Sequence, residues 1–335
     1  MNSIESNLDH IKDSLRSCHL CPRMCGVDRL SGQMGFCASP GGIVAARAAL
    51  HHWEEPCISG TRGSGTVFFS GCTLRCCFCQ NHQISQEAFG KALTSRQLAD
   101  VFLKLQDQGA HNINLVTATQ YLPWILPALD LVKNQLQIPV VYNCGGYERV
   151  ETIDALKDYV DIWLPDLKYM DSELSARLSR AEDYFEVASK AIARMIELTE
   201  KPVFHEEPPA STVDASAALL SDSTSRPAND DSSILMDRGV IIRHLVLPGH
   251  RDDSIRLLHW IADNLPKGQY YISLMSQYTP YCHNDHYPEL NRRITSYEYQ
   301  KVVDAALELG LEQGFMQEKS SAKEEYTPPF DLEGL

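Results

Sequence analysis

Residues 65–79 read Gly-Thr-Val-Phe-Phe-Ser-Gly-Cys-Thr-Leu-Arg-Cys-Cys-Phe-Cys. The β-branched and aromatic residues at the start of this stretch predict a buried strand, and a cysteine-rich loop follows it directly. Cys72, Cys76 and Cys79 form a Cys-x3-Cys-x2-Cys frame with an aromatic residue before the third cysteine. Three thiolates on one loop can hold three irons of a cubane cluster and leave the fourth iron without a protein ligand. Structural zinc is the alternative, but it normally takes four protein ligands.

Strand and helix patterns alternate after this loop. Further strands are expected at 112–117, 139–143, 161–166, 240–246 and 270–275, and helices at 98–105, 123–136, 152–159, 172–198 and 254–264. Thr94 and Gln97 fit a capping box before the first of these helices. The alternation predicts an α/β fold in which six βα units, from Thr66 to about Pro280, build a parallel sheet with right-handed crossovers.

The chain divides into three expected segments. We expect an N-terminal helix and a cysteine-rich element at 1–60, a core at 61–280 and a C-terminal extension at 281–335. Within the core, residues 207–237 are rich in serine, aspartate and proline and contain no aromatic residue. Such a segment cannot bury enough apolar surface to offset its chain entropy, so we interpret it as a flexible insertion.

The cysteine frame, its aromatic residue and the preceding strand together resemble the signature of the radical S-adenosylmethionine (radical SAM) superfamily. The resemblance implies a partial (β/α)6 barrel, with a 4Fe-4S cluster on Cys72, Cys76 and Cys79 and S-adenosylmethionine bound to the open iron. It also implies a reaction in which the reduced cluster cleaves S-adenosylmethionine to methionine and a 5′-deoxyadenosyl radical, which abstracts a hydrogen atom. Cys77 lies outside the frame, and we interpret it as a packed residue.

Polar residues gather where the predicted strands end, on the face where α/β barrels place their chemistry. They are Thr117, Thr119 and Gln120 after the second strand, Asn143 after the third, Asp166 and Lys168 after the fourth, Arg243 on the fifth, and Gln277 and Tyr278 after the sixth. S-adenosylmethionine offers a carboxylate, an ammonium, two ribose hydroxyls and an adenine, so its site needs donors, acceptors and a cation. We therefore expect it to bind among these residues. Taken alone, Asp166 and Lys168 are also typical of a surface ion pair.

Within the superfamily, the chain is similar to pyruvate formate-lyase activating enzyme and its relatives. The similarity lies in residues 70–76, in Asp166-Leu167-Lys168 and in residues 242–249. It implies that Lys168 contacts the S-adenosylmethionine tail and that Arg243 belongs to the same site. It also implies a protein or other bulky substrate, by analogy a glycyl-radical partner, and a reductant such as flavodoxin or ferredoxin.

The chain departs from these activases at three places. Residues 117–120 stand where the activases commonly carry Gly-Gly-Glu, Asn143-Cys144 replaces Asp-Thr, and Tyr278 replaces a histidine. Hydroxyl and amide oxygens can accept from the ammonium of S-adenosylmethionine but lack the charge of a carboxylate. The resemblance therefore does not extend to the hydrogen donor.

A second cysteine group precedes the core. Cys18, Cys21, Cys25 and Cys37 are separated by two, three and eleven residues, and glycines after Cys25 allow tight turns. Four such thiols suit structural zinc or an auxiliary iron–sulfur cluster, and reduced thiols in a packed hairpin are the alternative. With Trp53–Gly60 after it, this element is similar to a poorly characterised subgroup of activase-like radical SAM proteins.

The charge and the hydropathy of the 335-residue chain limit the classes of partner that we expect it to bind. It carries 30 basic and 44 acidic residues, a formal charge of −14, and no obvious basic stripe, which argues against a nucleic-acid partner. No apolar run reaches the roughly 18 residues of a membrane span, and the first residues lack the pattern of a secretory signal. We expect a cytoplasmic protein with no membrane partner, whose 11 cysteines are reduced. In a reducing compartment, clustered cysteines are expected to be metal ligands or catalysts and not halves of disulfides.

The function expected from these patterns is that of a radical SAM iron–sulfur oxidoreductase resembling the glycyl-radical activases. Two alternatives stay open. One is an electron-transfer or metal-binding iron–sulfur protein without S-adenosylmethionine turnover. The other is a radical SAM enzyme that modifies RNA or a small molecule.

Overall fold

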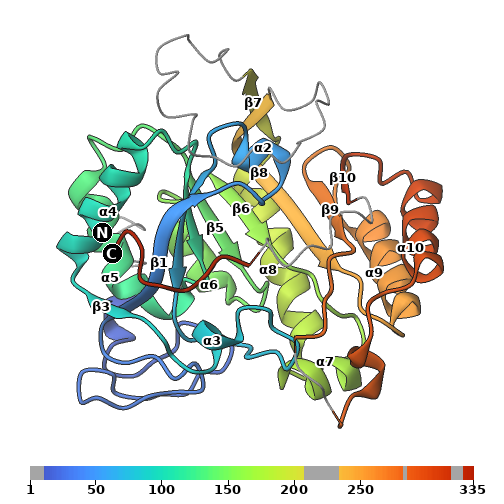
Figure 1. Cartoon of the computed structure of the whole chain (residues 1–335), viewed down its shortest axis with the longest axis horizontal. Coiled ribbons are helices and arrows are strands. Elements are labelled where there is room, and N and C mark those ends of the chain that lie inside the picture. Colours follow the sequence, from blue (N-terminus) through green and yellow to red (C-terminus); the bar gives the residue numbers. More distant parts are fainter. Residues whose placement is uncertain (1–10, 207–233, 282–284, 318–326) are drawn as a thin grey trace.

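Six parallel strands form the centre of the molecule (Figure 1). The computed structural model describes residues 11–206, 234–281, 285–317 and 327–335. The six strands are β2 (Ser64–Phe69), β4 (Ile113–Val116), β5 (Val140–Cys144), β6 (Ile162–Pro165), β8 (Ile234–Leu245) and β9 (Tyr271–Met275). They lie side by side in chain order, and each pairs in parallel with the next. The predicted six-unit sheet is thus confirmed, as an open partial barrel in which these strands run in the order β9-β8-β6-β5-β4-β2.

Helices surround the sheet, because each parallel crossover needs one (Figure 1). They are α4 (Ser95–Asp107), α5 (Leu122–Val132), α6 (Val150–Leu156), α7 (Ser172–Ser179), α8 (Tyr184–Thr199), α9 (Arg251–Asn264) and α10 (Ser296–Glu308). The capping box of α4 is present: the backbone N–H of Gln97 donates to the Thr94 hydroxyl, and the Gln97 side chain accepts from the backbone N–H of Thr94. Local sequence therefore sets the start of this helix.

The single helix expected at 172–198 is two helices, α7 and α8. Arg180 ends α7 in a left-handed conformation with a φ of 54°. Ser179, the last residue of α7, hydrogen-bonds the Cys76 sulfur at 2.9 Å and the Tyr169 hydroxyl at 2.7 Å. The break holds Ser179 beside the cysteine loop, and this tertiary contact leaves no periodic signal in the sequence.

Additional strands extend both edges of the sheet. β1 (Ile43–His51) pairs antiparallel with β2, and β3 (Lys91–Leu93) pairs with β1. At the other edge, β10 (Gly314–Met316) pairs in parallel with β9. The C-terminal residues run along β1, where Leu332 and Glu333 form backbone hydrogen bonds with it (Figure 1). The described residues also form four short helices: α2 (Pro56–Ser59), α3 (His82–Ser85), η1 (Thr119–Tyr121) and η2 (Pro288–Asn291).

The flexible insertion expected at 207–237 overlaps a strand at its last four residues. Residues 234–237 form the start of β8 and pair antiparallel with β7 (Val203–Glu206). Residues 234–236 are Ile-Leu-Met, and Leu235 and Met236 are buried, so the polar composition of the residues before them does not extend into this strand. Residues 207–233 lie outside the described residues, as do the first ten residues of the expected N-terminal helix and Cys282. The expected domain boundaries at 60 and 280 stay predictions.

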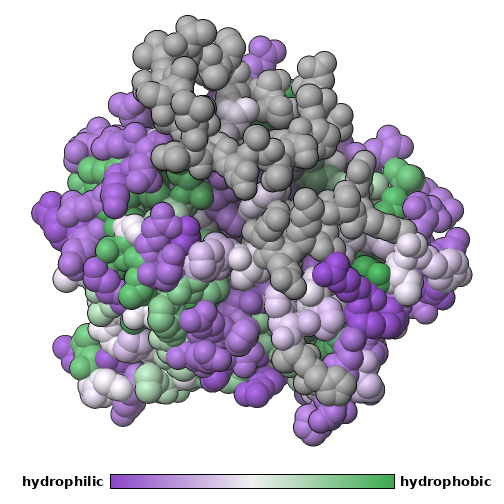
Figure 2. Space-filling model, viewed as in Figure 1, coloured by the Kyte–Doolittle hydropathy of each residue, from purple (hydrophilic) through white to green (hydrophobic). Residues whose placement is uncertain are grey.

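Large aromatic side chains fill the interior between sheet and helices. Phe69, Phe102, Tyr142 and Tyr184 are fully buried there. The face of the molecule in Figure 2 is mainly hydrophilic, with apolar residues in small scattered groups. Among the helices that the structure describes, none has the length and apolarity needed to cross a lipid bilayer.

Candidate active site

The loop after β2 brings Cys72, Cys76 and Cys79 to the wall of one pocket. Gly71 and Arg75 turn the chain sharply around these sulfurs, with φ values of 79° and 52°. Position 71 requires glycine, because an added Cβ would lie 2.6 Å from the carbonyl oxygen of Cys37. The cysteine loop therefore packs directly against the N-terminal element.

The three thiols of this loop influence one another electrostatically. Burial and then the Cys76 sulfur raise the pKa of Cys72 to about 12, and the same two causes raise the pKa of Cys79. Buried thiols this close ionise together only when positive charge compensates them. Iron supplies that charge in an iron–sulfur cluster, so the donor set fits such a group. The Ser179 hydroxyl already donates to the Cys76 sulfur, as it would to a thiolate ligand.

Cys77 faces away from this pocket. It does not line the pocket, and its backbone N–H donates to the carbonyl of Leu178 at 2.9 Å. Its partly buried side chain packs against the main core. The sequence interpretation of Cys77 as a packed residue agrees with this position.

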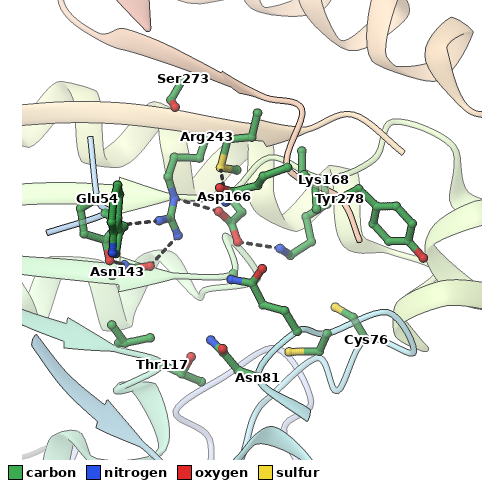
Figure 3. A pocket seen from close by; sticks show the side chains of 18 of the residues that line it. Glu54, Cys76, Asn81, Thr117, Asn143, Asp166, Lys168, Arg243, Ser273 and Tyr278 are labelled. Atoms are coloured by element: carbon green, nitrogen blue, oxygen red, sulfur yellow. Dashed lines mark hydrogen bonds and ion pairs between the residues drawn. The ribbon is translucent and has the colours of Figure 1, made fainter. Parts of the chain in front are cut away.

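A buried ion network crosses the pocket beside the cysteine loop (Figure 3). Asp166, which follows β6, accepts from Arg243 Nε at 3.0 Å and from Lys168 Nζ at 2.6 Å. Arg243, on β8, also donates to Asn143 Oδ1 at 2.6 Å and to Glu54 Oε2 at 3.2 Å. Because β5, β6 and β8 are neighbours in the sheet, residues far apart in the sequence meet at this point.

The pairings fix the charges of the network. Burial by itself would raise the pKa of Asp166, but Arg243 and Lys168 hold that pKa below its usual range. Burial would lower the pKa of Lys168, yet Asp166 and the nearby Cys76 sulfur raise it. Burial likewise would lower the pKa of Arg243, and Asp166, Glu55 and Glu54 raise it. Two permanent cations therefore face the pocket, and the Lys168 ammonium lies near the cysteine loop.

Most of the residues predicted at the strand ends line this pocket. Its lining includes Cys72, Cys76, Cys79, Thr117, Asn143, Asp166, Lys168, Arg243, Gln277 and Tyr278. Thr119 and Gln120 lie elsewhere. Thr119 Oγ1 donates to buried Glu148 at 2.8 Å, and Gln120 Nε2 donates to the carbonyls of Ser70 and Gly71 behind the cysteine loop.

Their expected place at the pocket is thus corrected. β4 ends at Val116, and Thr117 takes a left-handed conformation with a φ of 59°. The chain then enters η1, which buries Thr119 and Gln120 in the protein interior. Strand-end position alone did not reveal this turn.

Two acidic residues of the pocket were missed by the sequence analysis. Glu54 and Glu55 connect β1 to α2, and both line the pocket. Glu54 accepts from Asn114 Nδ2 at 3.1 Å and from Asn143 Nδ2 at 3.3 Å, in addition to its ion pair with Arg243. The available signal was two adjacent carboxylates between Trp53 and Pro56, shortly after the largely apolar residues 43–50, which were not among the predicted strands.

The N-terminal element keeps its four cysteines close to one another and to the cysteine loop. Cys18 and Cys21 are buried, Cys25 is exposed, and all four are free thiols. Burial raises the pKa of Cys18, and the sulfurs of Cys25 and Cys37 contribute to that rise. In the part of the chain that the structure describes, no three Cys, His, Asp or Glu side chains converge on a single-ion site. A metal at this element stays a prediction, and its identity is open between zinc and a cluster.

Comparison with known proteins identifies the domain. Residues 66–210 match the family model of the radical SAM superfamily. The chain carries a radical SAM domain. The chain is also similar to MJ0674, an uncharacterized protein of Methanocaldococcus jannaschii, with 28% identity over 321 residues, 93% of this chain and 80% of the relative. The superfamily is one of enzymes, and it implies a 4Fe-4S cluster and S-adenosylmethionine.

Several solved structures resemble the chain distantly. Streptococcus suis SuiB, in a complex with the precursor peptide SuiA, aligns with a TM-score of 0.47 and 12% identity over 74% of this chain and 46% of SuiB. Methylornithine synthase, PylB, aligns with a TM-score of 0.45 and 14% identity over 94% of this chain and 72% of that chain. A domain of pyruvate-formate lyase-activating enzyme from Bacteroides vulgatus aligns with a TM-score of 0.35 and 16% identity over 67% of this chain and 91% of that domain. The chain thus spans about half the length of SuiB.

Proposed function

We propose that this radical SAM protein reductively cleaves S-adenosylmethionine in the pocket described above, with Cys72, Cys76 and Cys79 as the ligands of its cluster. One observation carries the proposal: these three sulfurs open into the same pocket as the buried Lys168–Asp166–Arg243 network. A trio of thiols holds a cubane with one iron left over, and the neighbouring cations suit the carboxylate of an amino-acid tail.

The residues of the pocket have separable tasks in this proposal. When bound, the cluster and S-adenosylmethionine together supply a carbon radical that abstracts a hydrogen atom from a substrate. Lys168 presents an ammonium near the cysteine loop, and Asp166 orients both Lys168 and Arg243. Tyr184 fixes the backbone here, because its hydroxyl accepts from Lys168 N at 3.0 Å and lies 2.9 Å from the Asp166 carbonyl.

Asparagine side chains supply acceptors for the donors of the bound molecule. Asn81 lines the pocket two residues after Cys79, and its buried Oδ1 has no hydrogen-bond partner in the described part of the chain. A buried acceptor without a partner costs free energy, so a ligand donor at this point would stabilise the pocket. Asn81 therefore joins Thr117 and Asn143 as a residue that we assign to the S-adenosylmethionine site.

The substrate that we propose is a protein or another bulky molecule, in the manner of a glycyl-radical activase. This finer assignment rests on the motifs at 166–168 and 242–249 and on the open edge of the sheet. A flavodoxin or ferredoxin is the proposed reductant. The formal charge of −14 disfavours RNA as the substrate.

The test is S-adenosylmethionine cleavage by the anaerobically reconstituted protein after reduction with dithionite, with 5′-deoxyadenosine measured by liquid chromatography. We expect Cys76→Ala to reduce product to the protein-free background, because the cluster loses a ligand. Cys77→Ala is the matched control on the same loop, and we expect it to keep most of the activity. If the wild-type protein binds four irons at this loop and forms no 5′-deoxyadenosine, the proposal fails, and the result favours an electron-transfer or metal-binding protein instead.

A further inference from the structure

The carboxylates of Glu54 and Glu55 form the side of the pocket opposite the cysteine loop. In Figure 3, Glu54 and Cys76 lie at opposite sides, with Arg243 and Asp166 between them. Ser273 of β9, whose hydroxyl lowers the pKa of Glu55, also lies on the side away from Cys76. The turn into α2 fixes this pair, since Ile58 N and Ser59 N both donate to the Glu55 carbonyl.

The charges that line the pocket are not balanced. The described lining contains three carboxylates, on Glu54, Glu55 and Asp166, and two cations, on Lys168 and Arg243. Asp166 pairs with both cations, and Glu54 pairs with Arg243. Glu55 forms no ion pair within the described residues, although Arg243 acts on it through a longer electrostatic attraction.

One oxygen of Glu55 also lacks a hydrogen bond. The residue is 7% exposed, and its Oε2 has no hydrogen-bond partner among the residues that the structure describes. Burial first of all raises the pKa of Glu55 to about 7, with Glu54 adding to the rise and Arg243 and Ser273 opposing it. Glu55 also acts on Cys57 of α2, because burial and the Glu55 carboxylate raise the pKa of the Cys57 thiol. A buried carboxylate that has an unpartnered oxygen and no ion pair destabilises the folded protein unless a bound group compensates it.

We infer that Glu55 binds a cationic amino or guanidinium group of the substrate, at the end of the pocket remote from the cluster loop. The inference rests on the proposed function, because it takes the cysteine side of the pocket to be filled by the cofactors. An amino or guanidinium group would provide the two things that Glu55 lacks: a hydrogen-bond donor for Oε2 and a positive charge for the unmatched carboxylate. A neutral amide would provide the donor alone, and a carboxylate would add to the negative charge of Glu54.

The experiment uses the full-length protein, anaerobically loaded with its cluster, left unreduced and saturated with S-adenosylmethionine. n-Butylammonium and n-butylguanidinium are the probes, and butyramide and butyrate are the isosteric controls; binding is measured by isothermal titration calorimetry. We expect both cations to bind and both controls to fail. Affinity should rise about tenfold from pH 6 to pH 8, because the ionised form of Glu55 is the binding form and its population changes by that factor.

Three variants separate charge from structure. Glu55→Gln should weaken n-butylammonium binding at least about tenfold at pH 8 and remove its pH dependence. Glu55→Asp should keep the pH dependence at lower affinity. Ser273→Ala removes a neutral hydrogen-bond donor and should leave cation selectivity intact. Iron content and far-UV circular dichroism confirm that each variant carries its cluster and is folded.

Three outcomes would overturn the inference: butyramide binding as tightly as n-butylammonium, Glu55→Gln behaving as wild type, or Glu55→Gln weakening S-adenosylmethionine alone. The last would assign Glu55 to the cofactor. The cleavage assay keeps the two proposals apart. If reduced wild-type protein forms 5′-deoxyadenosine while Glu55 shows no cation preference, the inference fails and the proposed function stands.

Discussion

Asp166 organises the pocket through a single buried carboxylate. Its two oxygens accept from Arg243 and from Lys168, and the three side chains are each about one-sixth exposed or less. Removing one member of a buried charge group leaves the others without compensation, which costs far more than the group as a whole contributes. The pKa of Asp166, held low by Arg243 and Lys168 against the effect of burial, keeps this carboxylate ionised at neutral pH.

We expect Asp166→Asn to lower the free energy of unfolding by about 3–5 kcal/mol at neutral pH, because two buried cations lose their shared carboxylate. Urea denaturation followed by circular dichroism measures the loss. Glu186→Gln is the control: Glu186 pairs with Lys190 at 2.8 Å on an exposed face of α8, where such a pair contributes little. If the Asp166→Asn variant unfolded at the same urea concentration as the wild type, the carboxylate of Asp166 would not stabilise the network.

Arg23 links the N-terminal element to α7 and to the cysteine loop. Its guanidinium donates to the carbonyl of Thr73 at 3.0 Å, to that of Ser179 at 3.1 Å and to that of Arg180. It also stacks on Phe36, with 3.9 Å from its Cζ to the ring centroid. The last carbonyls of a helix need hydrogen-bond partners. Arg23 therefore caps the C-terminal end of α7 and also supports the loop that carries Cys72 and Cys76.

Arg23→Ala should therefore loosen the attachment of the whole N-terminal element. We expect a loss of about 2 kcal/mol in the free energy of unfolding, the usual effect of removing hydrogen bonds to a charged group. Bleaching of the cluster absorbance in the presence of a chelator should also accelerate. Arg16→Ala, at an exposed position of the same element, serves as the control. Equal bleaching rates in the two variants would show that Arg23 does not support the cysteine loop.

The elements set by local patterns were predictable, and those set by tertiary contacts were not. The strands before Cys72 and Asp166 and the cap at Thr94 each have a local cause, in burial or in a side-chain hydrogen bond. The break at Arg180 depends on partners more than a hundred positions away, Cys76 among them. The same holds for Glu54, because its place in the pocket depends on β1 pairing at the sheet edge.

The pH dependence of folding for the whole molecule follows from buried carboxyl groups. Burial raises the pKa of Glu148 to about 8, although hydrogen bonds from Thr119 and Tyr142 oppose the rise. A carboxyl with a raised pKa keeps its proton in the folded state after the unfolded chain has lost its own. Stability therefore falls as pH rises from the unfolded pKa through the folded one. His51, whose pKa burial lowers to about 4, has the opposite effect, but only below about pH 6.5.

Between about pH 6.5 and about pH 7.5, we expect the free energy of unfolding to fall by about 2 kcal/mol. Glu148 contributes more than half of this decrease and Glu55 most of the rest, because their pKa values of about 8 and about 7 lie above or within the interval. Anaerobic urea titrations at the two pH values measure the difference. Glu148→Gln should reduce the slope by more than half, because the amide keeps its hydrogen bonds to Thr119 and Tyr142 but no longer titrates. A slope that the substitution leaves unchanged would mean that Glu148 is ionised in the folded protein.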